Sequence, residues 1–473
     1  MLEHEDKVLL GGAFHYFRIP PTAWEKSINI LAGVLDYLDL YIPWGWHEPE
    51  DGTFDFEGKT HPMRNLKKVL DLARKNGIKL TLRPGPTIYA EYRFFGYPKW
   101  LLKNKEILQQ SVYGHKWKYG PNFHHPLYLE KANRWITKIL EFVAPYDDII
   151  IGYQIDNETG LYLADSYISP TPTIRDASPL TRKMFKERTG KEFPRPKLGW
   201  RLRGEFRNFG EMMMVQDFME WWIVEYLKKL RNGAFSKIPS DKLFLNDAVQ
   251  LMPPSNFTKK VEVAPVFFDL YPKVTSSKDV FDEPFLSCYG AKLYSSFSTC
   301  AVAECQCGWF DPNTRVKNEE TLQLVMDLIA HGAQSISLYI AQDCIEDDGT
   351  KYIYYSLLDP YGNENPRMEV IRKIRKFLDE WGKFIRQSEE IVDGDVAIIE
   401  HAPAHRSAGS DSFIYATQFL TAMGIVGLLE EMGHNPRILL AEKTSVDELL
   451  KYRVLIFPSN YFIDQEVAKK LEL

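Results

Sequence analysis

Cysteine is scarce in this sequence, with 5 residues among 473. All five lie between Cys288 and Cys344, and none forms the Cys-x-x-Cys spacing of structural zinc or redox sites. A disulfide framework would need more cysteines, spread along the chain. The sequence therefore predicts a fold without disulfides, and neither a metal ion nor a cofactor is expected.

Targeting signals and a basic excess are also missing. The charged start, Met1 to Lys7, lacks the apolar segment of a secretory signal, and no apolar run reaches the roughly 18 residues of a membrane span. The net charge is −6, whereas proteins that bind nucleic acids usually carry a surplus of basic residues. We therefore expect a cytoplasmic protein that binds neither membranes nor nucleic acids.

Two families of catalytic motif are absent as well. No nucleophile elbow with a Ser-His-Asp order occurs, and no glycine-rich phosphate loop follows a predicted strand. The pair Gly11-Gly12 lies inside the first predicted strand and indicates a bulge or a close approach of the backbone to substrate. Aromatic residues, in contrast, make up 14% of the chain, and their rings can fill a core or stack on sugar faces.

Short apolar runs alternate with longer amphipathic stretches over the first 385 residues or so. Runs such as Ile149-Ile150-Ile151 are typical of buried parallel strands. Eight strands separated mostly by helices predict an α/β fold, a (β/α)8 TIM barrel over residues 1–390. A doubly wound open sheet is the alternative. The eight predicted strands are Leu9–Phe17, Val34–Trp44, Gly77–Arg83, Ile149–Asn157, Leu243–Asp247, Val266–Leu270, Cys300–Glu304 and Gln334–Ile340.

A second pattern starts after Gly394. Predicted strands at 396–400, 438–440 and 454–457 alternate with helices, which indicates a partial, open α/β domain of flavodoxin-like type over residues 391–473. The series stops after its third strand, so we expect a truncated domain. The open sheet edge after Phe457 predicts self-association, as a homodimer.

Carboxylates gather where the predicted barrel strands end, which is where TIM barrels carry their catalytic groups. Cleavage of a glycosidic bond requires two carboxyl groups, one to protonate the leaving oxygen and one to attack or to activate water. His47 is expected to be a buried framework residue. The strand ends carry Glu48, Glu91, Asp156, Glu158, Asp247, Asp269, Glu304 and Asp343, and aromatics rim them at Tyr16, Tyr41, Trp44, Trp46, Tyr89, Trp309 and Tyr339.

Four segments, in order and on predicted strands, resemble the signatures of the family 35 glycoside hydrolases. They are Tyr41-Ile-Pro-Trp-Gly-Trp-His-Glu-Pro49, Arg83-Pro-Gly-Pro86 with Ala90-Glu91, Gln154-Ile-Asp-Asn157-Glu158-x-Gly160, and Glu304-x-x-x-Gly308-Trp309-Phe310. The resemblance covers about residues 8–385.

This resemblance implies a retaining glycosidase that uses two carboxylates. Glu158 would be the general acid/base, Glu304 the nucleophile, and Asn157 would hydrogen-bond the substituent at C2 of the sugar. The remaining implied binding residues hold the terminal sugar or form a stacking wall: Tyr41, Glu91, Tyr339 and Trp309. Retention further implies that the two carboxyl groups lie about 5–5.5 Å apart.

Departures from the family pattern bear on the substrate. Tyr89 stands where the β-galactosidases usually have cysteine, and the segment Asp269-Leu-Tyr271-Pro272 and the second domain are more similar to family 42 β-galactosidases. The mixture resembles archaeal exo-β-D-glucosaminidases, which implies chitosan oligosaccharides as substrate. Asp156 is then the first candidate to bind the C2 ammonium, and Asp269 the second. The alternatives are a β-galactosidase of the same fold and a non-catalytic carbohydrate-binding or assembly subunit.

Overall fold

The computed structural model describes most of the chain. The described residues are 6–112, 114–160, 176–194, 209–249, 256–272, 284–308, 316–407, 412–458 and 462–472.

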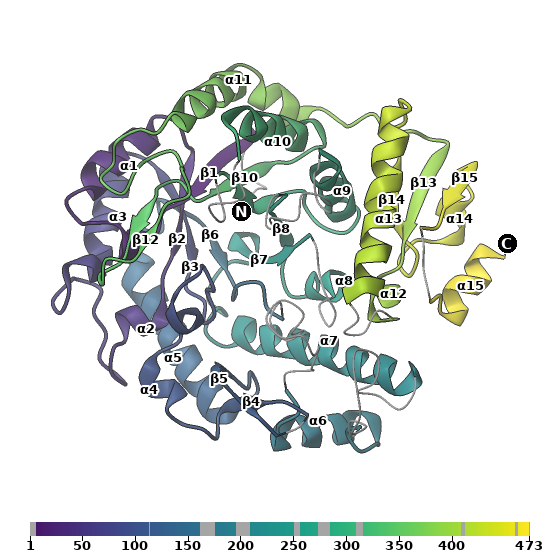
Figure 1. The fold of residues 1–473 in the computed structure, drawn as a ribbon, viewed down its shortest axis with the longest axis horizontal. Coiled ribbons are helices and arrows are strands. Elements are labelled where there is room, and N and C mark those ends of the chain that lie inside the picture. The colour runs from purple at the N-terminus through teal and green to yellow at the C-terminus, as the bar shows by residue number, and fades with distance from the viewer. Residues whose placement is uncertain are drawn as a thin grey trace.

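Eight parallel strands close into a barrel in the order β1-β10-β9-β8-β7-β6-β3-β2 (Figure 1). This closure confirms the predicted TIM barrel, and the alternative of an open doubly wound sheet is wrong. The barrel strands are β1 (Leu9–Ala13), β2 (Tyr37–Tyr41), β3 (Lys79–Arg83), β6 (Ile150–Gln154), β7 (Leu243–Ala248), β8 (Val266–Leu270), β9 (Val302–Gln306) and β10 (Ser335–Tyr339).

The barrel strands are buried on both faces, which explains their apolar sequences. Every residue of β8, β9 and β10 is buried. Tyr37, Phe244 and Phe267 pack together with Leu9 in one apolar cluster. Gly11 leaves room for this packing, because a Cβ at Gly11 would lie 2.1 Å from Cζ of Tyr37. The Gly11-Gly12 pair therefore serves internal packing, which corrects the expected approach to substrate.

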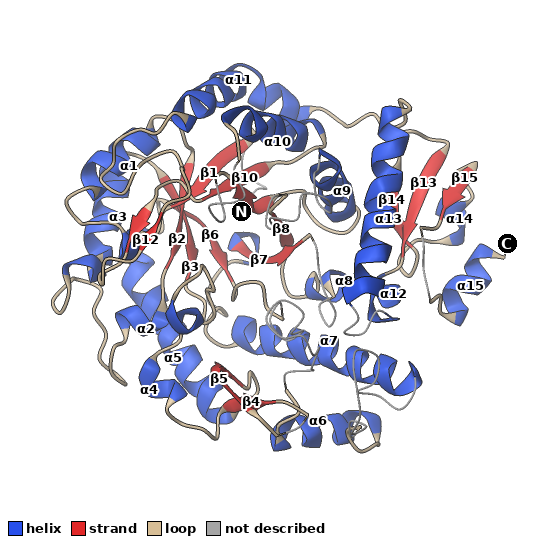
Figure 2. Cartoon of the chain, viewed as in Figure 1, coloured by secondary structure: helices blue, strands red, loops and turns tan. Residues whose placement is uncertain are grey.

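Helices surround the barrel (Figure 2). They are α1 (Trp24–Ala32), α2 (Trp44–His47), α3 (Leu66–Lys75), α4 (Lys99–Leu102), α5 (Pro126–Val143), α6 (Pro179–Thr189), α7 (Phe209–Asn232), α8 (Phe257–Lys260), α9 (Pro284–Ser295), α10 (Asn318–Ala330) and α11 (Arg367–Gln387). Two short hairpins interrupt this pattern, formed by β4 (Leu108–Gln110) with β5 (Lys116–Pro121) and by β11 (Cys344–Ile345) with β12 (Lys351–Tyr352).

The sequence pattern does not predict helix α9. It lies between the barrel and the second domain (Figure 1), and Leu286, Cys288, Tyr289, Ala291 and Leu293 are all buried. A helix covered on several sides has no broad polar face, so it lacks the amphipathic period that reveals surface helices.

The second domain contains a three-stranded parallel sheet in the order β14-β13-β15. This sheet confirms the predicted open α/β architecture. The elements are β13 (Val396–Glu400), α12 (Ala402–Ser407), α13 (Ser412–Glu431), β14 (Arg437–Leu440), α14 (Val446–Leu449), β15 (Val454–Ile456) and α15 (Gln465–Leu471). Polar contacts join it to the barrel: the Tyr289 hydroxyl donates to Glu400 at 2.9 Å, and His331 pairs with Glu430 at 3.0 Å. The expected boundary near residue 390 stays a prediction.

Two further sequence expectations can be compared with the described residues. All five cysteines are buried free thiols, in agreement with the absence of a disulfide framework. Within the described ranges, we find no helix whose length and apolar character would suit it to crossing a membrane.

Candidate active site

Three carboxylates meet at the carboxyl ends of the barrel strands. Glu158 follows β6, Asp269 lies on β8, and Glu304 lies opposite Asp269 on β9. One oxygen of each carboxylate lies within 4.8 Å of the others. A pair of carboxyl groups this close matches the geometry of retaining glycosidases, because inverting enzymes separate theirs by about 6.5–9.5 Å.

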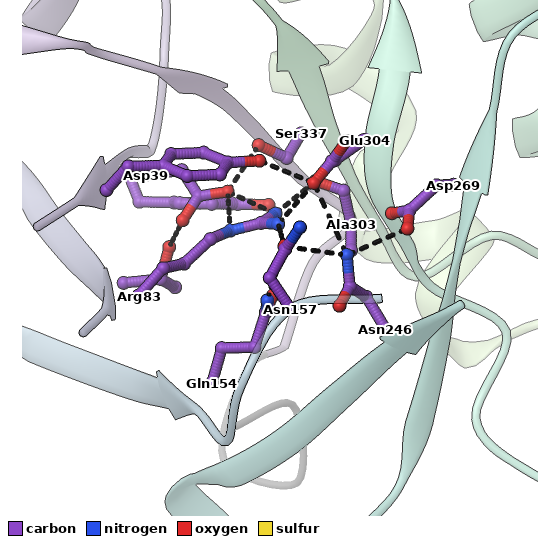
Figure 3. Close-up of polar contacts among 12 residues, drawn as sticks. Asp39, Arg83, Gln154, Asn157, Asn246, Asp269, Ala303, Glu304 and Ser337 are labelled. Carbon is purple, nitrogen blue, oxygen red and sulfur yellow. Dashed lines mark hydrogen bonds and ion pairs between the residues drawn. The ribbon is translucent and has the colours of Figure 1, made fainter. Parts of the chain in front are cut away.

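Glu304 is surrounded by hydrogen-bond donors (Figure 3). The Arg83 guanidinium donates to its Oε1 at 2.7 Å, and the Tyr41 hydroxyl donates to the same oxygen at 2.5 Å. The Tyr271 hydroxyl donates to Oε2. Both oxygens are thus occupied and the residue is only 5% exposed, so its carboxylate is aimed in one direction. Although three carboxylates could hold a cation, Arg83 already supplies positive charge here.

Arg83 links three barrel strands beneath the site. Its Nε donates to Asp39 on β2 at 2.8 Å, and a terminal nitrogen donates to the carbonyl of Ala303 on β9 at 2.5 Å. Asp39 also accepts hydrogen bonds from Thr81 and Ser337. The Arg83 guanidinium is fully buried, and these contacts hold it in a fixed position beside Glu304.

Glu158 has a different environment. Its backbone and that of Asp156 lie in the left-handed region, with φ values of 43° and 57°. Among the residues that the structure describes, none donates a hydrogen bond to the Glu158 carboxyl. Burial and the negative charge of Glu304 raise the pKa of Glu158 well above its usual value. A raised pKa favours the protonated carboxyl, which is the form that can act as a general acid.

Asn157 lies beside Glu158 with its amide held in place. Its Oδ1 accepts hydrogen bonds from Gln154 at 2.8 Å, Asn246 at 3.1 Å and Arg83 at 3.3 Å. Its Nδ2 donates to the carbonyl of Ile88 at 3.3 Å. This network fixes which end of the amide faces which neighbour.

The two candidate partners for a C2 ammonium differ in what they contact. Both oxygens of Asp156 serve the loop, because Oδ1 accepts from the backbone N–H of Thr87 and Oδ2 from the hydroxyl of Thr159, each at 2.8 Å. Burial raises the pKa of Asp156 to about 6.

In Asp269, Oδ2 accepts from Asn246 at 2.7 Å. Its Oδ1 is buried and has no hydrogen-bond partner in the described part of the chain. Burial, together with the charges of Glu304 and Glu158, raises the pKa of Asp269 well above its usual value.

Among the other predicted sugar-binding residues, Tyr339 contacts both Glu91 and Tyr41. The Tyr339 hydroxyl donates to Glu91 at 2.5 Å, and the Tyr339 ring meets that of Tyr41 edge-on at 6.2 Å. Trp309 lies outside the described residues. Trp44, expected at the rim, is instead in the core and stacks on Trp135.

Several strand-end acids have structural partners away from the three carboxylates. Glu48 pairs with Arg134, and Asp247 pairs with Lys260 at 2.6 Å. Asp343 accepts hydrogen bonds from the backbone N–H groups of Tyr354 and Ser356. The two ring nitrogens of His47 hydrogen-bond the Tyr16 hydroxyl and the Asp55 carbonyl, as expected for a buried framework residue.

The sequence interpretation missed two polar residues of the site, Asn246 and Tyr271. Asn246 directly precedes the strand-end residue Asp247, and Tyr271 lies in the Asp269-Leu-Tyr-Pro segment. Each was therefore adjacent to a residue already considered, and only the direction of the side chain was unknown.

Residues 1–190 match the family model of the glycosyl hydrolases family 35. The match includes Asn157 and Glu158 and ends before Glu304. The chain is 30% identical to an exo-beta-D-glucosaminidase from Thermococcus kodakarensis over 254 residues, which is 48% of this chain and 32% of the relative. It is 39% identical to an exo-beta-D-glucosaminidase from Pyrococcus horikoshii over 167 residues, 33% of this chain and 22% of the relative. The matches thus span less than a third of these curated relatives.

Solved structures resemble the chain over nearly its whole length. A beta-galactosidase from the psychrophilic Marinomonas ef1 has a TM-score of 0.76 at 17% identity, covering 98% of this chain and 74% of the other. A beta-galactosidase from Bacillus circulans sp. alkalophilus has a TM-score of 0.77 at 16% identity, covering 100% of this chain and 70% of the other. At this identity, the likeness establishes the fold alone.

Proposed function

We propose that the protein is a retaining, exo-acting β-glycosidase. The observation that carries the proposal is the close pairing of Glu158 with Glu304, because one oxygen of each lies within 4.8 Å of the other. Their environments also differ in the way that double displacement requires. Glu304 accepts hydrogen bonds from four donors, whereas burial and the charge of Glu304 raise the pKa of Glu158. The match to the family 35 model supports the same reading.

The reaction would proceed in two steps. In the first, a Glu304 oxygen bonds to the anomeric carbon while the bond to the leaving oxygen breaks and that oxygen takes the proton of Glu158. In the second, Glu158 removes a proton from water, whose oxygen displaces Glu304 from the anomeric carbon. Two inversions give net retention. In the covalent intermediate Glu304 carries no charge, so its repulsion of a Glu158 carboxylate ends. The pKa of Glu158 would then fall, which suits its role as the base.

Kinetics of paired variants test this assignment. Glu304→Gln should lose activity, and azide should rescue Glu304→Gly by forming a glycosyl azide of inverted configuration. Glu158→Gln should lower kcat by roughly 10²–10⁴-fold on substrates whose leaving group needs protonation. The exposed Glu25→Gln serves as control and should retain full activity. Full activity of Glu304→Gln would contradict the proposal.

We propose β-D-glucosaminides, released from chitosan oligosaccharides, as the substrate class. Asp269 supports this choice, because its buried Oδ1 lacks a partner among the described residues and lies beside the carboxylates that would surround C1 and C2. The negative charge of this group of carboxylates would stabilise an ammonium at C2, whereas a neutral hydroxyl would gain less from it. Asp156 is the weaker candidate because its oxygens already bind Thr87 and Thr159.

A substrate comparison tests this choice. The kcat/KM ratio of p-nitrophenyl β-glucosaminide over β-galactoside should exceed one. Asp269→Asn should lower this ratio by roughly 10-fold or more, as expected for the loss of one hydrogen bond between charged groups. Asp156→Asn is the matched control and should leave the ratio within about 3-fold. If the wild-type kcat/KM ratio of glucosaminide over galactoside is below one, the β-galactosidase alternative is favoured. The names of the structural neighbours suggest that alternative.

One alternative and one further expectation accompany this proposal. A non-catalytic carbohydrate-binding subunit would bind chitosan oligomers without turnover, and the paired carboxylates count against it. A cytoplasmic homodimer is also proposed, and sedimentation equilibrium would measure its subunit number.

A further inference from the structure

Asn246 hydrogen-bonds four residues at the paired carboxylates: Asn157, Glu158, Asp269 and Glu304. It lies on β7, is 2% exposed, and its Oδ1 accepts the backbone N–H of Glu158 at 2.9 Å. Its Nδ2 faces Asp269 Oδ2 at 2.7 Å, Asn157 Oδ1 at 3.1 Å and Glu304 Oε1 at 3.3 Å. Figure 3 shows the Asn246 amide with dashed lines to Asp269, Asn157 and Glu304.

The bond to the Glu158 N–H replaces a missing strand contact. The ladder between β6 and β7 pairs Gln154 with Phe244, and its last hydrogen bond runs from the Ile155 N–H to the Phe244 carbonyl at 2.9 Å. Beyond this point the chain turns away. Asn246 lies two residues after Phe244 on β7. There its side chain, instead of the β7 backbone, hydrogen-bonds the turn that follows β6.

The turn needs this support because of its conformation. Glu158 has a φ of 43°, in a region that residues with a side chain rarely adopt. Such a residue keeps its conformation only when its surroundings hold it there. Since the Glu158 carboxyl accepts no hydrogen bond from any described residue, its direction depends on the backbone of the turn.

The orientation of the Asn246 amide is also determined. The Glu158 N–H is a donor, so the amide oxygen must face it, and the NH₂ group must then face the three acceptors. Aspartate at this position would place an additional negative charge beside Asp269 and Glu304. An apolar residue would leave the buried Glu158 N–H without a partner.

We propose that Asn246 is the positioning residue for Glu158, holding the turn that aims the general acid/base at the leaving oxygen. The role given to Glu158 rests on the proposed function, but the contact itself does not. Two measurements therefore separate the two proposals.

The first measurement compares leaving groups. The value of kcat/KM reports the first step, in which dinitrophenolate leaves without a proton. Asn246→Ala should therefore lower kcat/KM on a disaccharide or p-nitrophenyl glycoside at least 10-fold more than on a dinitrophenyl glycoside. Asn122→Ala is the control, because Asn122 is equally buried and hydrogen-bonds Asp176, Ser178 and Thr181 away from these carboxylates. Equal losses on both kinds of substrate would overturn the proposal.

The second measurement needs no activity. Hydrogen exchange of the Glu158 amide should become at least 10-fold faster in Asn246→Ala and stay unchanged in Asn122→Ala. Unchanged exchange in Asn246→Ala would overturn the proposal. If that variant does not fold, Asn246→Ser, whose hydroxyl is too short to reach, should give the same result. If the wild type cleaves no aryl glycoside, the proposed function fails, and the exchange rate alone decides the role of Asn246.

Discussion

Replacing Arg83 with methionine should destabilise the barrel strongly. Arg83 is the buried cation between Asp39 and Glu304, and the two carboxylates are 2% and 6% exposed in their side chains. Methionine keeps much of the side-chain volume but removes the charge and all donors. Asp39 and Glu304 then lie in the barrel without their positive partner.

The magnitude follows from burial. Removing one partner of a buried ion pair typically costs about 3–5 kcal/mol, because the other charge stays desolvated. We therefore expect the free energy of unfolding of Arg83→Met to fall by at least about 3 kcal/mol in urea titrations followed by tryptophan fluorescence. Arg372→Met is the control, because Arg372 and its partner Glu364 are 51% and 37% exposed in their side chains and exposed pairs contribute about 0–1 kcal/mol.

A double variant tests the cause. Asp39→Asn added to Arg83→Met removes one orphaned charge, so the double variant should be more stable than Arg83→Met alone by about 1 kcal/mol or more. A loss in Arg83→Met no larger than in Arg372→Met would refute the reasoning. Additive losses in the double variant would show that the pair with Asp39 is not the cause.

Three further changes have defined outcomes. Tyr271→Phe removes a donor to Glu304, so kcat/KM in steady-state assays should fall by roughly 10-fold or more, and an unchanged value would contradict this contact. Burial raises the pKa of Asp156 to about 6, above its unfolded value, so the wild type loses stability as the pH rises through 6. The Tm of Asp156→Asn relative to wild type should therefore be higher at pH 8 than at pH 5. Burial lowers the pKa of His331, but the hydrogen bond to Glu430 and the charges of Asp327 and Glu430 together outweigh it and raise the pKa. These contacts therefore stabilise most below pH 6.5 and weaken as the pH rises. The Tm lost in His331→Ala should be larger at pH 6 than at pH 9.

The strands were predictable because of how a barrel buries them. A strand covered on both faces is apolar along its length, as in β8 and β10, and the predicted positions agree with the observed ones to within a few residues. Helix α9 and the two hairpins were not predictable. The helix is covered on several sides and the hairpins have two to six residues per strand, so neither shows a clear period.

The sequence by itself determined the barrel, the parallel sheet that follows it and the placement of Glu158 and Glu304 at strand ends. These features depend on local apolar patterns and short motifs, which a chain displays in order. Only the tertiary structure decided which acid has a free oxygen. Asp156 binds Thr87, 69 residues away, whereas Asp269 leaves Oδ1 without a partner in the described chain. It also brought Asn246 to Glu158, 88 residues apart. Hydrogen-bond partners that are far apart in the sequence come together only when their strands pack side by side in the barrel. A local sequence pattern therefore cannot predict them.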